Sequence, residues 1–320
     1  MPESAQKKEN NISVILPAYN EKGNIRVVIE KSVKALKDNR YPGEVILIND
    51  GSNDGTKEEA ESIAANFNNV RVINHRKNEG LTEALLSGFK AAKGDVIVFL
   101  CADMQSDPEE DIPRLVQEIL NGSDVILGWR QGRKGMRAIV SRIYHMLSKF
   151  FFGISLHDMN WIKAFRKEVV EQINLRSDWH RYIPVLAGDM GFSIKEVKTS
   201  YYPRMSGKTK YGTWRILSGA LDLLTIRLEL SFVKKPMHLF GSIGLLSLLS
   251  GSLLGIWIGL QFLIFGLQNP PSKGVYFLLL LLVLVGIQFF SFGFIAEFLV
   301  SIKDKISSLE ERLNSKSGNK

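Results

Sequence analysis

The chain has 320 residues, of which 45% are hydrophobic and 23% are charged, and its formal net charge is +8. A chain of this length has room for one or two domains. Its single cysteine, Cys101, excludes an intrachain disulfide, and the polar start MPESAQKKENN predicts no cleavable signal peptide.

The first half of the chain alternates short apolar runs with segments of helical spacing. The apolar runs, which end in turn residues as buried parallel strands do, cover residues 12–17, 45–49, 70–74, 95–100 and 124–127. The helical segments cover residues 22–39, 56–67, 81–92 and 109–121. This order predicts a mostly parallel sheet with helices on both faces, whose ligands bind beyond the carboxyl ends of the strands.

Two basic clusters follow. Residues 130–149 carry six basic residues and no acid, and residues 198–235 carry eight basic residues against two acids. They contain two segments with apolar faces and basic flanks, residues 137–152 and 213–232, which suit core-covering helices or helices on a membrane surface. Because these clusters lie near the apolar end of the chain, anionic headgroups or a lipid phosphate fit them better than nucleic acid does.

The end of the chain predicts a transmembrane hairpin. Leu239 to Leu267 runs 29 residues without a charge, and Val275 to Val300 runs 26 residues with one acid, the boundary residue Glu297. Each run exceeds the roughly 20 residues that cross a bilayer, and a Pro-Pro turn separates them. More lysines flank the two runs on their outer sides than lie in the turn between them, and this positive-inside bias predicts that both termini are cytoplasmic. Small residues in the first run favour close helix packing and a homo-oligomer.

Four parts are therefore expected along the chain. They are an α/β domain over 1–212, an amphipathic juxtamembrane helix over 213–235, two spans within 236–302 (about 239–267 and 275–300), and a cytoplasmic tail over 303–320.

Polar residues follow three of the predicted strands. The segments are Pro17-Ala18-Tyr19-Asn20-Glu21, Asn49 to Thr56, and Cys101-Ala102-Asp103-Met104-Gln105. Since parallel strands end at one edge of a sheet, their carboxylates and amide converge there. Asp103 and Gln105 offer the oxygen ligands that Mg²⁺ and Mn²⁺ prefer. The second segment, taken alone, is equally a turn before an N-capped helix.

As a set, these motifs resemble glycosyltransferase family 2. Further matches are Asn78-x-Gly80-Leu81, Ala91-x-x-Gly94-Asp95 and Pro108-Glu109. Asp158 and the Arg204-x-x-Gly207-x-Thr209-Lys210-Tyr211 segment resemble the branch of dolichol-phosphate mannose synthases and polyprenyl-phosphate glucosyltransferases. The resemblance implies a GT-A (Rossmann-like) domain, inverting transfer from a nucleotide-sugar, and a divalent metal, Mg²⁺ or Mn²⁺.

The resemblance also implies roles for individual residues. The expected nucleotide-sugar contacts are Pro17, Ala18, Tyr19, Glu21, Asp50, Ala102 and Asp103. The expected metal ligands are Asp103 and Gln105, and the expected catalytic residues are Asp158, Asp103 and Arg130. Asp158 also suits the N-cap of a helix over 160–173. The family has an Asp in place of Cys101, whose neutral thiol is a poor magnesium ligand, so we expect it to pack at the strand end.

The expected acceptor is a lipid phosphate, which is already largely dianionic at neutral pH and needs little help from a general base. The harder task is to hold two anions together, and the metal and arginines supply that charge. Arg130 is a candidate for this task, with Arg204 and Lys210 at the acceptor phosphate. The competing interpretation makes them solvated surface residues.

The sequence thus predicts a hexosyltransferase that moves glucose from UDP-glucose, or mannose from GDP-mannose, onto undecaprenyl phosphate at the cytoplasmic face of a bacterial inner membrane. A processive polysaccharide synthase would show a Gln-x-x-Arg-Trp motif and more spans, and neither is present. A glycosyltransferase with a small soluble acceptor would not need a membrane hairpin. A non-catalytic nucleotide-binding membrane scaffold is the alternative from another class, and it would release no nucleoside diphosphate.

Overall fold

The computed structural model describes residues 10–131, 146, 149–150, 152–153, 156–202, 225–226, 236–266 and 270–317. The chain divides into two compact units, Met1–Ala220 and Leu221–Lys320. The expected boundary at residue 212 lies outside the described residues. Most of the two expected amphipathic helices lies outside the described residues.

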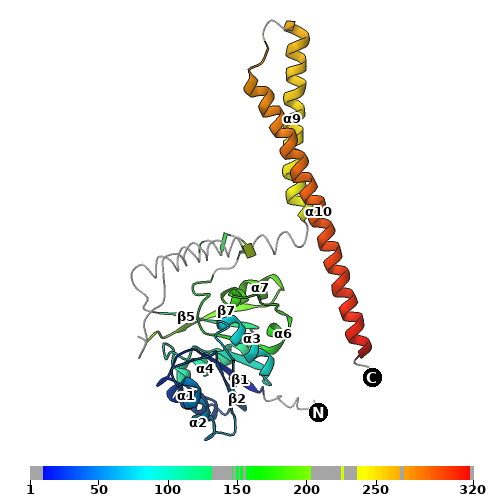
Figure 1. Cartoon of the computed structure of the whole chain (residues 1–320). Helices are drawn as coiled ribbons and strands as arrows, with labels where there is room; N and C mark the ends of the chain where they lie inside the picture. The colour runs from blue at the N-terminus through cyan, green and yellow to red at the C-terminus, as the bar shows by residue number, and fades with distance from the viewer. Residues whose placement is uncertain are drawn as a thin grey trace, which may run out of the picture. The chain divides into compact units, whose positions relative to one another are not determined.

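The first unit is built on a seven-stranded sheet with the order β3-β2-β1-β4-β6-β5-β7 (Figure 1). Its strands are β1 Ile12–Ala18, β2 Gly43–Asn49, β3 Val70–Asn74, β4 Val96–Phe99, β5 Val125–Arg130, β6 Lys163–Arg166 and β7 Ile194–Thr199. Strand β6 pairs antiparallel with β4 and β5, and the remaining pairs are parallel. The expected mostly parallel sheet is therefore confirmed, with one reversed strand.

Helices cover both faces of this sheet. They are α1 Ile25–Asp38, α2 Thr56–Ala64, α3 Leu81–Ala91, α4 Pro108–Leu120, α6 Lys167–Gln172, the short 3-10 helix η1 Trp179–Tyr182, and α7 Ile183–Asp189. On one face, Leu16 of β1 shares a core cluster with Val28 of α1 and Ile112 of α4. On the other face, Ile15 meets α3 at Gly88. This alternation along β1 buries the strand on both sides.

The second half of this unit departs from the sequence predictions. The helix expected over 160–173 is wrong, because residues 163–166 form β6 and only Lys167–Gln172 is helical. Pairing between β4 and β5 fixes this segment as a strand, a tertiary effect that overrides local propensity. Strand β7 was not predicted, since its sequence IKEVKT carries three charged residues.

The second unit contains two long helices, α9 Pro236–Phe265 and α10 Lys273–Ser317. Their stretches Pro236–Ile264 and Lys273–Ile302 have mean hydropathies of 2.0 and 2.6, and both are long and apolar enough to cross a membrane. Helix α10 continues past its apolar stretch into the segment expected as a polar tail.

The two long helices pack closely through small residues, as expected. A Cβ added to Gly244 would lie 2.7 Å from the backbone nitrogen of Phe290 and 2.9 Å from the carbonyl oxygen of Gly286. Such an approach requires glycine on α9. Near the C-terminal end of the apolar stretch of α10, Glu297 Oε2 accepts a hydrogen bond from the backbone N–H of Met237 at 3.2 Å. This boundary residue thus serves the first turn of α9.

Candidate active site

The carboxyl ends of the parallel strands meet at one edge of the sheet, together with the beginning of the reversed strand β6. Most of the predicted site residues lie at this edge. They are Tyr19 and Glu21 after β1, Asp50 after β2, Asp103 and Gln105 after β4, Arg130 at the end of β5, and Asp158 before β6. The sheet order therefore produces the convergence that the sequence predicts.

The segment Ser52–Thr56 supports the loop after β1. Three backbone N–H groups of that loop donate to side chains of this segment: Asn20 to Ser52 Oγ at 3.0 Å, Glu21 to Thr56 Oγ1 at 2.9 Å, and Lys22 to Asp54 Oδ2 at 3.1 Å. Asp54 Oδ1 also accepts from the backbone N–H of Thr56 at 3.0 Å. The side chains of Ser52–Thr56 thus hold turns together, as the turn interpretation of the Asn49–Thr56 segment predicts.

Asp50 is buried, and its carboxylate organises the loop that leads into α3. Its Oδ1 accepts from the backbone N–H of Glu79 and lies 2.9 Å from Nδ1 of His75, while its Oδ2 accepts from the backbone N–H of Gly80. The neighbouring Gly51 has a φ of +68°, and a Cβ there would lie 2.2 Å from the carbonyl carbon of Lys77. A direct contact between Asp50 and a nucleotide stays a prediction.

The other predicted donor contacts differ in how much side chain they expose. Ala18 and Ala102 are buried, with 3% and 2% of each residue exposed. Tyr19 is 37% exposed, and its predicted contact with the nucleotide stays a prediction. Pro17 is half-buried, and Glu21 Oε2 accepts from Asn24 Nδ2 at 2.8 Å.

Asp103 and Gln105 form the predicted metal pair. Asp103 is 7% exposed, and its Oδ1 accepts from the backbone N–H of Gln105 at 3.2 Å. Gln105 Nε2 donates to the Tyr201 hydroxyl at 2.9 Å, which orients the amide and leaves its carbonyl oxygen as a ligand. Burial raises the pKa of the nearby Cys101 thiol to about 12, so it stays neutral and packs against the core, as expected.

Arg130 and Asp158 form a bidentate ion pair at this edge, where β5 ends and β6 begins. Arg130 Nε lies 2.5 Å from Asp158 Oδ2, and Nη2 lies 2.8 Å from Oδ1 and 3.0 Å from the carbonyl oxygen of Asn160. The two side chains are only 8% and 5% exposed. The guanidinium carbon sits 4.4 Å from the centroid of the Trp161 ring. Asp158 therefore holds an arginine, and the expected helix N-cap is wrong.

Glu196 on β7 fixes the backbone that carries Asp158, and the sequence did not reveal it. Its Oε1 accepts from the backbone N–H groups of His157 and Asp158 at 2.7 and 3.1 Å. Its Oε2 lies 2.7 Å from His157 Nδ1, and the His157 ring stacks on Trp129 at 4.0 Å. Residues 194–199 (IKEVKT) show no alternation of polar and apolar residues, so no local pattern marked Glu196 as part of a half-buried strand.

Arg204 and Lys210, the predicted acceptor-phosphate residues, lie outside the described residues. Their role stays a prediction.

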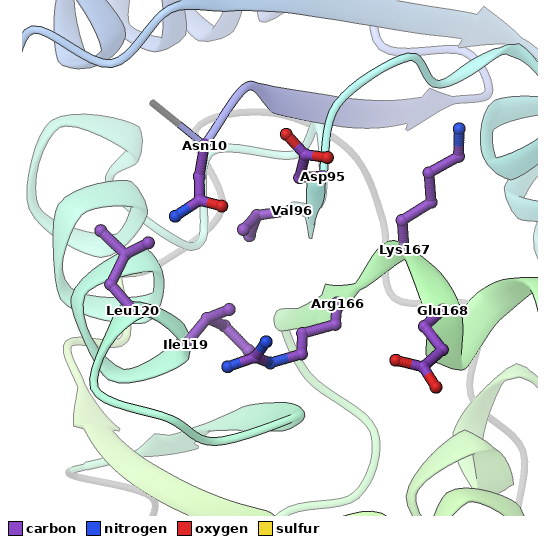
Figure 2. A pocket seen from close by; sticks show the side chains of 8 residues that line it. All are labelled: Asn10, Asp95, Val96, Ile119, Leu120, Arg166, Lys167 and Glu168. Carbon is purple, nitrogen blue, oxygen red and sulfur yellow. The ribbon is translucent and has the colours of Figure 1, made fainter. Parts of the chain in front are cut away.

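A separate hollow lies at the opposite edge of the sheet, beside the amino end of β4 and the carboxyl end of β6. It has a volume of about 280 Å³, and Figure 2 shows the eight side chains that line it. They are Asn10, Asp95, Val96, Ile119, Leu120, Arg166, Lys167 and Glu168. None of the predicted site residues lines this hollow.

The sheet and the polar residues at its strand ends define a nucleotide-binding α/β domain of the GT-A class. Residues 13–182 match the family described as glycosyl transferase family 2, and the chain belongs to this family. It is a glycosyltransferase, as the sequence motifs predicted.

Two relatives cover almost the whole chain. The dodecaprenyl-phosphate galacturonate synthase of Rhizobium johnstonii is 30% identical over 89% of this chain and 86% of its own length. The undecaprenyl-phosphate 4-deoxy-4-formamido-L-arabinose transferase of Pectobacterium atrosepticum is 32% identical over 90% of this chain and 88% of its own length.

Among solved structures, the chain is similar to glucosyl-3-phosphoglycerate synthase from Mycobacterium tuberculosis in complex with Mn²⁺, UDP-glucose and phosphoglyceric acid. The TM-score is 0.56 at 22% identity, over 68% of this chain and 79% of that one. This likeness confirms the fold.

Proposed function

We propose that this glycosyltransferase moves a sugar from a nucleotide-sugar onto a polyprenyl phosphate, with inversion at the sugar carbon. The observation that carries the proposal is the buried Arg130–Asp158 pair beside Asp103 and Gln105. Two membrane-length helices in the same chain suit a lipid acceptor. The names of the two relatives support the same acceptor class.

In this proposal Asp158 positions Arg130 and is not a general base. Both of its oxygens accept hydrogen bonds from the arginine, so the carboxylate is paired with a buried positive charge. A phosphate acceptor is largely dianionic at neutral pH and does not need deprotonation. Arg130, held between Asp158 and the Trp161 ring, supplies a fixed positive charge for the phosphates that separate during transfer.

The residues present fit a divalent cation. Asp103 and Gln105 would hold it through oxygen atoms, and the donor diphosphate and water would complete the shell, as is usual for Mg²⁺. Within the described ranges, no group of three His, Cys, Asp or Glu residues could bind a metal without such help. When bound, the cation would neutralise negative charge on the leaving diphosphate.

The donor sugar is the finer part of the proposal. UDP-glucose is the first candidate and GDP-mannose the second, on the resemblance described above. The relatives are named for galacturonate and 4-deoxy-4-formamido-L-arabinose, so these sugars belong in the same test.

A donor screen with full-length protein in detergent and undecaprenyl phosphate tests the proposal. UDP-glucose, GDP-mannose, UDP-galacturonate and UDP-4-deoxy-4-formamido-L-arabinose are each supplied with Mg²⁺ or Mn²⁺. We expect one of them to yield a glycolipid and an equal amount of nucleoside diphosphate. The variant Arg130→Met serves as the inactive control. If no donor gave lipid-dependent release of nucleoside diphosphate, the scaffold alternative would replace this function.

We also propose that Arg204 and Lys210 bind the acceptor phosphate and that the enzyme forms a homo-oligomer in the inner membrane of a bacterium. Both termini are proposed to lie in the cytoplasm. Cysteine labelling on a Cys101→Ala background tests the topology. A cysteine introduced at position 310 should resist an impermeant reagent in intact cells, whereas one at position 272 should react. Labelling at position 310 from outside would contradict the topology.

A further inference from the structure

One tyrosine side chain contacts two separate parts of the strand-end edge. Tyr201 follows the edge strand β7, and its hydroxyl oxygen accepts a hydrogen bond from Gln105 Nε2 at 2.9 Å. The guanidinium carbon of Arg130 lies 5.8 Å from the centroid of the same tyrosine ring. Tyr201 therefore links a predicted metal ligand to the arginine of the buried ion pair.

The ring of Tyr201 is held in place by its surroundings. It packs edge-to-face against the ring of Trp161, with the two centroids 5.8 Å apart and the planes at 70°. Trp161 is only 3% exposed, and its Nε1 donates to Thr199 Oγ1 at 3.2 Å. Tyr201 itself is partly buried and packs against the hydrophobic core cluster. Its hydroxyl therefore has a defined position relative to the end of β7.

The backbone beside Tyr201 is bonded to the same loop independently of the hydroxyl. The N–H of Tyr202 donates to the carbonyl oxygen of Gln105 at 3.0 Å. Arg114 Nη1 on α4 donates to the carbonyl oxygen of Lys198, near the end of β7, at 3.1 Å. These bonds hold the segment after β7 against its neighbours without help from the hydroxyl. The hydroxyl bond therefore concerns the side-chain amide of Gln105.

The orientation of that amide decides whether Gln105 can bind a cation. A glutamine binds metal through its carbonyl oxygen, because its amide nitrogen is a donor. The Tyr201 hydroxyl accepts from Nε2, so it occupies the nitrogen end of the amide. Removing an outer group that orients a metal ligand commonly weakens metal binding about 10–100-fold. The hydroxyl therefore favours the orientation in which Gln105 can serve as a ligand.

The ring of Tyr201 contacts the other part of the site. The guanidinium carbon of Arg130 lies 4.4 Å from the centroid of Trp161 and 5.8 Å from that of Tyr201, so both rings attract the cation. Asp158 holds the same guanidinium through two hydrogen bonds. Because the ring and the hydroxyl of Tyr201 form one rigid group, the orientation of Gln105 and the position of Arg130 are linked.

We propose that Tyr201 is a positioning residue that orients Gln105 for the divalent cation and supports Arg130 at the phosphates. The inference rests on the proposed function for the metal ligands and for the role of Arg130. Loss of the hydroxyl alone weakens cation binding, whereas loss of the ring also impairs transfer at saturating cation.

Cation binding tests the role of the hydroxyl without sugar transfer. Full-length protein in detergent is titrated with Mn²⁺ in the presence of UDP, and in parallel with GDP, while free Mn²⁺ is followed by electron paramagnetic resonance. Tyr201→Phe removes only the hydroxyl, and we expect about tenfold weaker Mn²⁺ binding. The matched control Tyr202→Phe removes the hydroxyl of the neighbouring tyrosine, which is 39% exposed, and should bind Mn²⁺ as the wild type does.

A double variant shows whether the hydroxyl acts through Gln105. Gln105→Ala should itself weaken Mn²⁺ binding, and adding Tyr201→Phe should cause no further loss. A further loss as large as that of Tyr201→Phe alone would overturn the positioning role. Wild-type Mn²⁺ affinity in Tyr201→Phe, with a lower thermal midpoint in metal-free buffer, would assign the hydroxyl to stability and overturn the role as well.

Transfer rates test the role of the ring. With the donor found in the screen, Tyr201→Phe should need about tenfold more Mn²⁺ for its half-maximal rate but reach the wild-type kcat at saturation. Tyr201→Leu, which also removes the ring, should keep a lower kcat at saturating Mn²⁺. Wild-type kcat in Tyr201→Leu would overturn the support of Arg130.

Failure of this inference is distinguishable from failure of the proposed function. If the wild type binds Mn²⁺ and transfers sugar, unchanged Mn²⁺ affinity in Tyr201→Phe overturns the role of the hydroxyl alone. If the wild type binds Mn²⁺ but transfers no sugar, the proposed function fails, and the support of Arg130 fails with it, whereas the titration still decides the role of the hydroxyl. If the wild type binds no Mn²⁺ with either nucleotide, the metal assignment and the role of the hydroxyl are both overturned.

Discussion

Asp158→Asn tests how much the buried ion pair contributes to the fold and to transfer. The asparagine keeps the shape of the side chain, but its amide nitrogen would face the guanidinium of Arg130, which lies 2.5 and 2.8 Å from the two carboxylate oxygens. Both side chains are more than nine-tenths buried, so the arginine is left as an uncompensated charge. Breaking one partner of such a pair costs about 3–5 kcal/mol of unfolding free energy.

That cost is large enough to measure on the intact protein. For a domain of roughly 150–250 residues, 1 kcal/mol moves the thermal midpoint by about 2–4 °C, so we expect a fall of roughly 6–20 °C. The assay is thermal unfolding of the full chain in detergent, followed by tryptophan fluorescence. Glu30→Gln is the matched control, because the Arg26–Glu30 pair is 57% and 49% exposed and is worth at most about 0.5 kcal/mol.

A double variant separates stability from function. Arg130→Met combined with Asp158→Asn removes the orphaned charge, so it should recover much of the lost stability while transfer stays at background. If Asp158→Asn shifted the midpoint no more than Glu30→Gln does, the ion pair would not contribute the unfolding free energy assigned to it. If the double variant transferred sugar at the wild-type rate, Arg130 would have no place in the chemistry.

Three further predictions address other groups of the domain. Glu196→Gln should lower kcat about tenfold with little change in donor KM, because it loosens the backbone of His157 and Asp158. If this variant kept wild-type initial rates, Glu196 would have no positioning role. Asp103→Asn, or EDTA on the wild type, should abolish transfer, and full activity in EDTA would exclude the metal. Burial raises the pKa of Asp111 from 3.8 to about 7, so the folded state holds a proton that the unfolded chain loses, and the stability that this group contributes falls as the pH rises from about 4 to about 7. Asp111→Asn should lessen that fall in midpoint, and identical pH profiles would contradict it.

The sequence predicted the first part of the fold well for a physical reason. Strands β1, β2 and β4 are buried on both faces, so they are continuous apolar runs that local patterns identify. The membrane-length helices were equally clear. Strands β6 and β7 are short and partly polar, and only their pairing with β4 and β5 makes them strands.

The site was predictable as a set of residues but not as a set of contacts. Asp103, Arg130 and Asp158 were identified, yet the pairing of the last two depends on the reversal of β6, which no local pattern contains. Asp50 illustrates the opposite case. It belongs to a recognisable motif, but its carboxylate is occupied by backbone N–H groups of the following loop.

The contact between Glu297 and the first turn of α9 bears on how the pair of long helices is assembled. The N–H groups at the start of a helix have no partner within that helix, and here the second helix supplies an acceptor to one of them, the N–H of Met237. During synthesis α9 emerges before α10, so this acceptor does not exist until the last turns of the apolar stretch have been made. The first helix is therefore completed by the second, and the hairpin reaches its final structure only when both helices are present.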